Sequence, residues 1–298
     1  MPISVELKGR LGNQLFQYAA LRNISIKKGY DIFIDTNFMW HGQQCLLSYF
    51  NLHEYSLPGP IYYEYSQPHN SRFFDSNIYN IPDNTLLHGH FENVEYFNEN
   101  LDIIKDELIV KDDNINNSIN NFIKYIMEEP TILEGASINS LILPNRNQES
   151  KELESKLVVI HFRLGDIIQE LPCSDEHIKR TQDFAFESLE TIMKTEPSIK
   201  IIVIGGGLRK GTNMFIPRTH EDDMDIIKNF VSECKCKYNH KIHISPGTLE
   251  DNEIFDYGLI SKCHYVISPY QSTFSFMAYY TSKTCIKLFS PTNLYGVL

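Results

Sequence analysis

The sequence predicts an α/β protein with two Rossmann-like domains that face each other across a cleft. Short β-rich apolar runs alternate with amphipathic segments, which is the pattern of a parallel sheet covered by helices, and this alternation occurs twice. The polar stretch 143–156 separates the two series. A chain of 298 residues is long enough for two domains of about 150 residues each. We therefore expect one domain at 1–150 and the other at 151–298.

The first series is a βαβ unit. Strand-like residues 3–7 lead through a glycine turn into the helical segment 13–29, and strand-like residues 31–35 follow. We expect Asn13 to cap the start of the helix and Gly29 to end it, because these residue types favour those positions. The stretch 40–85 lacks a clear period and is left unassigned. The Asn-rich run 112–125 is interpreted as compositional bias without a chemical role.

The second series predicts five strands with a helix or loop after each of the first four. The strand-like runs are 157–162, 199–204, 241–245, 264–268 and 285–289. Amphipathic segments lie near 181–195, 222–234, 250–262 and 272–281. In open parallel sheets, ligands bind beyond the carboxyl ends of the strands, where helix N-termini point inward. This rule nominates the loops KGRLGNQ, HFRLGD, IGGGLRKG, SPGTLEDN and SPYQSTF as the candidate site.

The composition argues against several classes of protein. The formal net charge is −11 and the basic residues form no block, so no nucleic-acid partner is expected. No apolar run approaches the roughly 20 residues that span a bilayer, and the N-terminus enters a strand directly, so we expect a cytoplasmic protein without a transmembrane segment. The six cysteines have scattered spacings, which indicates reduced thiols. Nothing in the sequence indicates the oligomeric state.

His161, Arg163 and Asp166 lie at and just beyond the carboxyl end of the first strand of the second series. A guanidinium at this edge can fork onto a diphosphate and offset the negative charge that grows on a leaving group. The alternative is a structural ion pair between Arg163 and Asp166 at a turn. The spacing alone is compatible with both interpretations.

Ser272, Thr273 and Phe274 open an apolar helix after the fourth strand of the second series. Hydroxyls and free backbone N–H groups at such a helix start form an anion site. The alternative is simple capping, because Ser and Thr are among the commonest helix caps.

The loop GRLGNQ is a weaker signal of the same kind. Gly12 lets the backbone approach a ligand, while Arg10 and Asn13 supply hydrogen-bond donors. A short glycine turn between a strand and a helix is common, so this loop alone does not identify a function.

Metal sites and several enzyme classes are disfavoured. Asp223 and Asp225 have a metal-binding spacing, but they open an amphipathic segment in which acidic residues stabilise the first helical turn. A G-x-S-x-G nucleophile elbow and a Walker phosphate loop are both absent from the sequence. One further set of side chains could be drawn as a zinc site, although its spacing is unusual: Cys234, Cys236, His240 and His243.

Four motifs in this order resemble the inverting α-1,2-fucosyltransferases, which belong to the GDP-fucose-dependent enzymes with paired Rossmann-like domains of GT-B type. The motifs span the chain and are GRLGNQLFQYAAL, LHGHFENVEYF, VVIHFRLGDII and DYGLISKCHYVISPYQSTFSFMAYYTSK. The resemblance implies an acceptor-side first domain and a second domain that binds the nucleotide sugar. Four ordered motifs are far more specific than any one of them.

The resemblance also implies roles for the matching residues. Arg163 would hold the β-phosphate and assist the departure of GDP, while His161 and Asp256 would contact the guanine nucleotide. Ser272 and Thr273 would hold the diphosphate at the helix start. The expected donor-binding residues are Arg10, Gly12, His161, Arg163, Asp166, Asp256, Ser272, Thr273 and Phe274.

The expected catalytic residues are Arg163, Asn13 and Glu170. In similar enzymes the position of Asn13 lies near the sugar–diphosphate linkage. Glu170 is the first candidate for the base that takes the acceptor proton, because it follows the phosphate loop; Asp166 and Glu92 are the alternatives.

The sequence departs from the family pattern at two places. The usual HxRRxD motif has a second arginine, and Leu164 stands there instead. The acidic motif after the next strand is replaced by Gly205, Gly206 and Gly207, which are followed by Arg209 and Lys210. Membrane-anchored animal members begin with a signal-anchor segment, which this sequence does not show, so the resemblance is to the soluble microbial form.

The expected function is transfer of L-fucose from GDP-β-L-fucose to a hydroxyl of a glycan acceptor. We expect this hydroxyl to be O2 of a galactose-like residue, and we expect the transfer to invert the configuration and to need no metal or other cofactor. The replaced acidic motif leaves open a transferase that uses another nucleotide sugar. Leu164 leaves open a catalytically silent protein that binds nucleotides or glycans.

Overall fold

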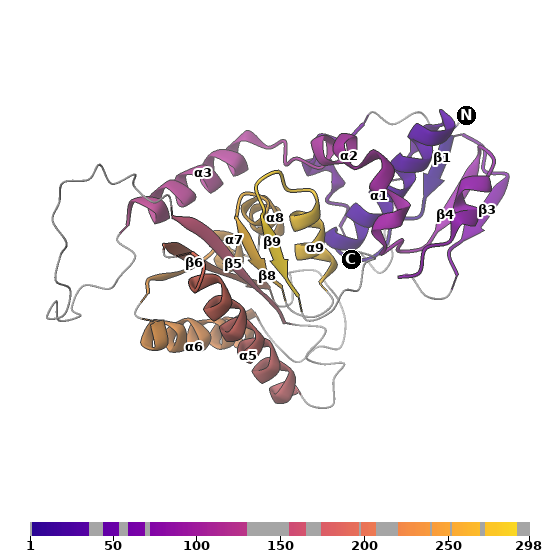
Figure 1. Cartoon of the computed structure of the whole chain (residues 1–298). Helices are drawn as coiled ribbons and strands as arrows, with labels where there is room; N and C mark the ends of the chain where they lie inside the picture. Colours follow the sequence, from indigo (N-terminus) through magenta and orange to yellow (C-terminus); the bar gives the residue numbers. More distant parts are fainter. Residues whose placement is uncertain are drawn as a thin grey trace, which may run out of the picture.

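The structure is a computed structural model of the chain, and it consists of two parallel α/β halves that pack side by side (Figure 1). The predicted fold class, α/β with two Rossmann-like units, is confirmed. The division at residue 150 stays a prediction. The structure describes residues 2–35, 44–53, 59–68, 72–129, 155–164, 174–196, 198–206, 220–238, 240–250, 252–268 and 272–290.

The first sheet is parallel and has the strand order β2-β1-β4-β3. The strands are β1 (Pro2–Val5), β2 (Asp31–Phe33), β3 (Tyr63–Ser66) and β4 (Thr85–His88). The predicted strands at 3–7 and 31–35 are confirmed as β1 and β2. β3 was not predicted because it is an edge strand with mostly exposed residues, so its sequence lacks a buried face. The carboxyl ends of the neighbouring strands β1 and β4 lie side by side.

Helix α1 (Leu11–Lys28) joins β1 to β2 and is buried on most of its surface. Gly29 ends it in the left-handed region at φ 67°, with its N–H bonded to the carbonyl of Ser25, as the sequence predicts. The prediction that Asn13 caps the helix is wrong. Arg10 is the N-cap residue, and its side chain makes no capping bond. Asn13 lies inside the first turn, and its side chain is bonded to Thr273 and His90 instead.

Helix α3 (Asp113–Glu128) forms in the Asn-rich segment that was interpreted as compositional bias. Asp112 caps it by accepting hydrogen bonds from the backbone N–H groups of Asn114 and Ile115. Ile119 and Ile126 are fully buried on its apolar face. The other described elements between β2 and β5 are α2 (Leu101–Glu107) and the 3₁₀ helices η2 (Leu47–Tyr49), η3 (Ser76–Asn80), η4 (Val94–Tyr96) and η5 (Asn98–Asn100).

The second sheet is also parallel, with the order β7-β6-β5-β8-β9. Its strands are β5 (Lys156–Arg163), β6 (Ile199–Gly206), β7 (Ile242–Ile244), β8 (Tyr265–Ile267) and β9 (Lys287–Phe289), so all five predicted strands are confirmed. Chain order runs outward from β5 to β7 on one side and from β8 to β9 on the other. The strand order therefore reverses between β5 and β8, which is where ligands bind in doubly wound sheets.

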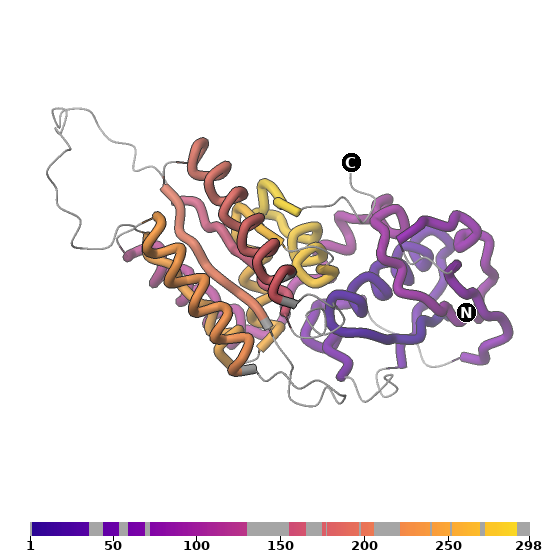
Figure 2. The backbone as a smooth tube through the Cα atoms, turned by 90° about the horizontal axis from the view of Figure 1, so that it is seen from below, coloured from indigo at the N-terminus to yellow at the C-terminus, as the bar shows by residue number. Residues whose placement is uncertain are grey.

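Helices cover both faces of the second sheet (Figure 1). The helices of this half are α5 (Ser174–Met193), α6 (His220–Tyr238), α7 (Pro246–Glu250), α8 (Glu253–Ile260) and α9 (Thr273–Tyr280). α5 and α6 lie on the near face in Figure 2 and pack on Val158, Ile160 and Phe162 of β5. The alternate residues Leu157 and Val159 belong to the core on the opposite face, as the two-residue period of a strand requires.

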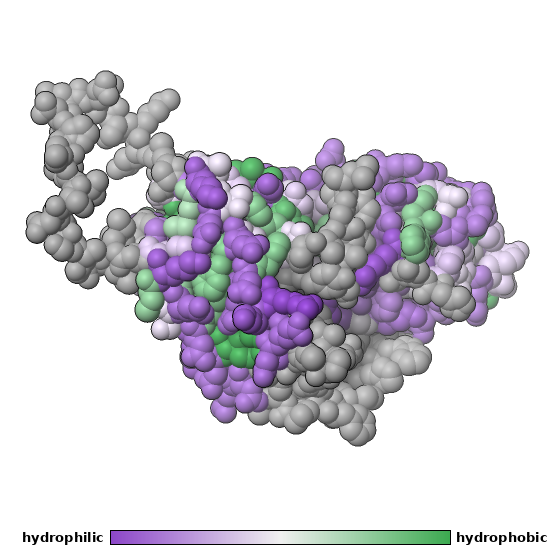
Figure 3. Space-filling model, turned by 60° about the horizontal axis from the view of Figure 1, so that its bottom comes forward, coloured by the Kyte–Doolittle hydropathy of each residue, from purple (hydrophilic) through white to green (hydrophobic). Residues whose placement is uncertain are grey.

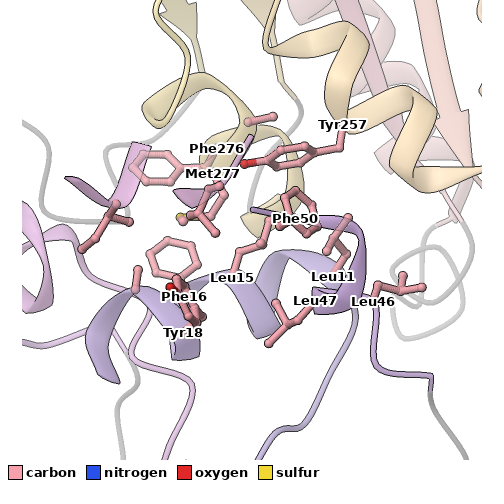
Figure 4. Close-up of a cluster of buried hydrophobic side chains, with 14 of the residues drawn as sticks. Leu11, Leu15, Phe16, Tyr18, Leu46, Leu47, Phe50, Tyr257, Phe276 and Met277 are labelled. Atoms are coloured by element: carbon pink, nitrogen blue, oxygen red, sulfur yellow. The ribbon is translucent and has the colours of Figure 1, made fainter. Parts of the chain in front are cut away.

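One hydrophobic core joins the two halves. Figure 4 shows side chains of α1, α8 and α9 together with Phe50. Phe16 of α1 stacks on Phe276 of α9 with ring centroids 5.8 Å apart, and Phe50 meets Tyr257 of α8 edge to face at 5.2 Å. Because α1 follows β1 and α9 follows β8, this packing holds the carboxyl ends of the two sheets next to each other.

The face shown in Figure 3 is a mixture of hydrophilic and hydrophobic side chains. Among the described residues, no helix combines the length and the apolar character needed to cross a bilayer.

Candidate active site

His161 and Arg163 lie at the carboxyl end of β5. His161 is only 7% exposed, and its Nδ1 lies 3.3 Å from the hydroxyl of Ser272, which precedes α9. Its ring also lies 5.5 Å from that of Phe274. Arg163 is half-buried two residues further along, so strand alternation directs it to the same face of the sheet as His161. Leu164, at the position of the missing second arginine, is buried in the core beneath α5 and α6.

The first turn of α9 faces this end of β5. Ser272 is the N-cap residue, and its hydroxyl accepts a hydrogen bond from the backbone N–H of Ser275 at 3.4 Å. The predicted helix start is therefore confirmed, and the capping interpretation of Ser272 is correct. The backbone N–H groups of the first turn give this end of the helix a partial positive charge. A cap and an anion site can coexist here, since one capping bond leaves other N–H groups of the turn available.

Gly12 allows α1 and α9 to meet at their N-termini. A Cβ atom at this position would lie 2.5 Å from the backbone nitrogen of Phe274 and 2.6 Å from Oγ1 of Thr273. Such distances are shorter than any van der Waals contact, so only glycine fits. Gly12 therefore has a packing role that the sequence did not indicate.

Asn13 connects the two halves at this point. Its Oδ1 accepts a hydrogen bond from the hydroxyl of Thr273 at 2.8 Å, and its Nδ2 lies 3.2 Å from Nδ1 of His90. The structure thus brings six predicted residues into one cluster and adds His90, which sequence reasoning missed. The six are Gly12, Asn13, His161, Ser272, Thr273 and Phe274; Arg10 is the residue from which α1 starts.

His90 follows β4 and is held by its backbone. Oε1 of Gln67 accepts hydrogen bonds from the N–H groups of His90 at 3.1 Å and Phe91 at 2.9 Å. Phe91 is buried with φ 53°, a left-handed conformation that is unusual for an aromatic residue. Burial lowers the pKa of His90; Glu92 opposes this shift and Lys8 adds to it. Burial therefore favours the neutral form of the imidazole.

Asp256 lies in a separate hydrogen-bonded group at the ends of β6 and β7. It is 4% exposed and accepts hydrogen bonds from the hydroxyls of Ser245 and Thr248, the latter at 2.9 Å. Oγ1 of Thr248 in turn accepts the N–H of Gly205 at 3.0 Å. The buried carboxylate thus organises the two strand ends; its implied contact with a guanine nucleotide stays a prediction.

The glycines that replace the acidic motif have a partial explanation in packing. A Cβ atom on Gly205 would lie 2.7 Å from Cδ1 of Ile227 in α6 and 3.0 Å from the carbonyl oxygen of Phe162 in β5. A side chain at this position would push the end of Ile227 aside and press on the β5 backbone, so the packing of β6 favours glycine here.

Several predicted positions lie outside the described residues, namely Asp166, Glu170, Gly207, Arg209 and Lys210. The alternative base Glu92 is described: its side chain is 13% exposed and lies 4.0 Å from Arg72. Asp223 lies in the first turn of α6, in agreement with the helix-start interpretation. Within the part of the chain that the structure describes, no cluster of three or more His, Cys, Asp or Glu side chains could hold a metal ion.

No family model matches the sequence, and no curated protein matches it. Solved structures match over nearly the whole chain. A structure of the α-1,6-fucosyltransferase NodZ soaked with GDP-fucose is 12% identical with a TM-score of 0.53, covering 94% of this chain and 92% of its own; NodZ was also solved from Bradyrhizobium.

Two other solved structures match the chain in the same way. A mutant of FUT1 from Arabidopsis thaliana in complex with GDP is 9% identical with a TM-score of 0.55, covering 99% of this chain and 72% of its own. POFUT1 in complex with GDP is 10% identical with a TM-score of 0.54, covering 97% of each chain. The chain therefore has the two-sheet GT-B-like fold of these proteins.

Proposed function

We propose that the chain transfers L-fucose from GDP-β-L-fucose to O2 of a galactose-like residue in a glycan acceptor, with inversion and without a metal. The main support is the cluster formed by His161 of β5 and the Ser272–Thr273 start of α9, at the reversal point of the second sheet. The fold likeness to proteins that were solved with GDP or GDP-fucose supports the donor.

In this mechanism the bond between the sugar C1 and the β-phosphate oxygen breaks, and its electron pair leaves with GDP. The acceptor oxygen forms its bond to C1 from the opposite face, which inverts the configuration. Arg163 and the N–H groups at the start of α9 stabilise the charge that develops on the diphosphate. Glu170 remains our first candidate for the base that takes the acceptor proton.

A screen of nucleotide sugars tests this proposal. GDP-fucose, GDP-mannose and UDP-galactose are each incubated with galactose-terminated disaccharides, with and without EDTA, and both nucleotide release and product linkage are measured. We expect acceptor-dependent release with GDP-fucose, an α-1,2 linkage in the product, and no effect of EDTA.

Each part of the proposal can fail separately in this screen. Turnover with only another donor would contradict the donor assignment, while a different linkage would contradict the acceptor position. Loss of turnover in EDTA would contradict the metal-independent mechanism. GDP binding without turnover of any pair would instead favour a silent nucleotide-binding protein, the alternative that Leu164 suggests.

A further inference from the structure

Hydrogen bonds hold His90 at its backbone N–H and at Nδ1 of its ring. Its backbone N–H is bonded to Gln67, and the adjacent Phe91 is locked in a left-handed conformation. Its ring is held through Nδ1 by Asn13, which is held in turn by Thr273. Among the described residues, Nε2 of His90 has no hydrogen-bond partner, although the side chain is partly exposed. The loop thus holds His90 at its backbone N–H and at Nδ1 and leaves Nε2 unpaired among the described residues.

The position of this atom connects the two halves of the site. β1 and β4 are neighbours in the first sheet, so the start of α1, which carries Asn13, and the loop after β4, which carries His90, leave the sheet side by side. On the other side of Asn13 lies Thr273, at the helix start where we place the diphosphate. His90 is therefore on the first-sheet side of the cluster, separated from the diphosphate position by the Asn13 side chain.

We propose that His90 binds the acceptor substrate by donating a hydrogen bond from Nε2 to an oxygen of the sugar residue that is fucosylated. This inference rests on the proposed function and adds a residue that recognises the acceptor. An acceptor sugar must lie opposite the leaving diphosphate for inversion, and His90 is the side chain that extends the cluster in that direction.

The hydrogen-bond pattern determines which ring nitrogen carries the proton. Thr273 donates to Oδ1 of Asn13, so the amide Nδ2 faces His90. An amide nitrogen can only donate, so Nδ1 of His90 accepts and the proton of the neutral ring is on Nε2. Burial lowers the pKa of His90 and favours this neutral form, with Glu92 and Lys8 as the neighbouring charges that act on it. His90 is thus a donor to substrate, and the proton acceptor of the reaction is another group.

Three substitutions separate the two ring nitrogens. His90→Gln places an amide nitrogen near the position of Nε2. His90→Asn places an amide oxygen near the position of Nδ1, where it can accept from Asn13. His90→Phe keeps the ring shape without either nitrogen. Steady-state kinetics with GDP-fucose and a galactose-terminated disaccharide give KM for each substrate, and hydrolysis of GDP-fucose without acceptor reports on the donor site. His240→Phe, in the loop before β7, is the matched control for loss of a histidine ring.

We expect His90→Phe and His90→Asn to raise the acceptor KM about tenfold, the effect of one lost hydrogen bond of moderate strength. His90→Gln should stay within about threefold of wild type. The donor KM and donor hydrolysis should change less than the acceptor KM in all three variants, and both should stay within about twofold of wild type in the control His240→Phe.

An unchanged acceptor KM in His90→Phe overturns the inference while leaving the transfer function intact. An acceptor KM raised as much in His90→Gln as in His90→Phe also overturns the inference. The amide of Gln can replace a hydrogen-bond donor but not a base, so this result would mean that His90 accepts a proton. If wild-type protein shows no fucosyl transfer at all, the proposed function fails first, and this inference fails with it.

Discussion

A single glycine residue, Gly12, determines how closely the two halves approach each other. Gly12 lies in the first turn of α1, where its missing side chain leaves room for the backbone of Thr273 and Phe274. Alanine would favour the helix by roughly 0.5–1 kcal/mol over glycine. Overpacking against a rigid backbone costs about 1–3 kcal/mol, so the steric effect outweighs the helix propensity.

We therefore expect Gly12→Ala to lower the free energy of unfolding by about 1–2 kcal/mol in urea denaturation and to weaken GDP binding, because the start of α9 must shift. Gly29→Ala is the matched control. Gly29 has φ 67° and open space around it, so alanine there also costs about 1 kcal/mol but leaves α9 in place. A Gly12→Ala protein with wild-type stability and GDP affinity would show that the contact is not tight.

The structure gives Leu164 a packing role that the sequence did not predict. In the sequence it is a missing arginine, while in the structure it belongs to the core formed by β5, α5 and α6. The substitution therefore contributes to packing on the opposite face from the site. Arg163 remains on the face of His161 and α9, where leaving-group charge would be stabilised.

Thr248 of α7 connects its own helix to β6 and α8 in the second half. Its hydroxyl accepts the N–H of Gly205 at the end of β6 and donates to the carboxylate of Asp256 in α8. All three residues are buried, so a lost hydroxyl cannot be replaced by bulk water. An unsatisfied buried polar group costs about 1–3 kcal/mol.

Thr248→Val keeps the shape of the side chain and removes the hydroxyl, so we expect it to lower the free energy of unfolding by about 2 kcal/mol. Thr248→Ser keeps the hydroxyl and removes one methyl group, which should cost about 1 kcal/mol. Chemical denaturation of both variants measures the difference. Equal stability of the two would mean that the hydroxyl bridge contributes nothing.

The sequence predicted the second sheet better than the first for a physical reason. The strands β5 and β6 are buried on both faces, so they read as continuous apolar runs that few other elements produce. β3 is short and exposed at an edge, and α3 has a narrow apolar stripe within an Asn-rich segment, so neither gives a strong local pattern. Their places depend on contacts with distant parts of the chain.

The candidate site, like the fold, could be predicted from the sequence only in part. The rule that ligands bind at the carboxyl ends of parallel strands selected the loops after β1, β5 and β8, which the structure brings together. The rule missed His90 because β4 was not predicted and because its partner Asn13 lies 77 residues away in sequence. The capping prediction for Asn13 was wrong for the same reason: a local pattern suggests a helix cap, and only the tertiary structure supplies His90 and Thr273 as partners.

The contact between α1 and α9 couples the two halves at the scale of the whole molecule. The shared core makes this contact extensive, and the Thr273–Asn13 hydrogen bond joins its two helix starts directly. Donor and acceptor sides of the proposed site are thus held in a fixed relation by residues 260 positions apart. Positioning of this kind is a large part of the catalysis of group transfer.

A double-mutant cycle measures this coupling. We expect Asn13→Ala and Thr273→Val to be non-additive in the free energy of unfolding by about 0.5–1.5 kcal/mol, because each single change removes the same hydrogen bond. Asn13→Ala combined with Ser282→Ala is the control pair, since Ser282 bonds to Ser261 instead. Additive effects in the first pair would contradict a direct link between the halves.

In the proposed mechanism Arg163, at the end of β5, stabilises the charge on the departing GDP. The most direct test of this role is the rate of fucosyl transfer from GDP-fucose by Arg163→Ala, measured at saturating acceptor and compared with wild type. We predict a fall of about 10²-fold or more, since a lost preorganised donor has this effect on charged leaving groups and transition states. A rate within about threefold of wild type would contradict the account.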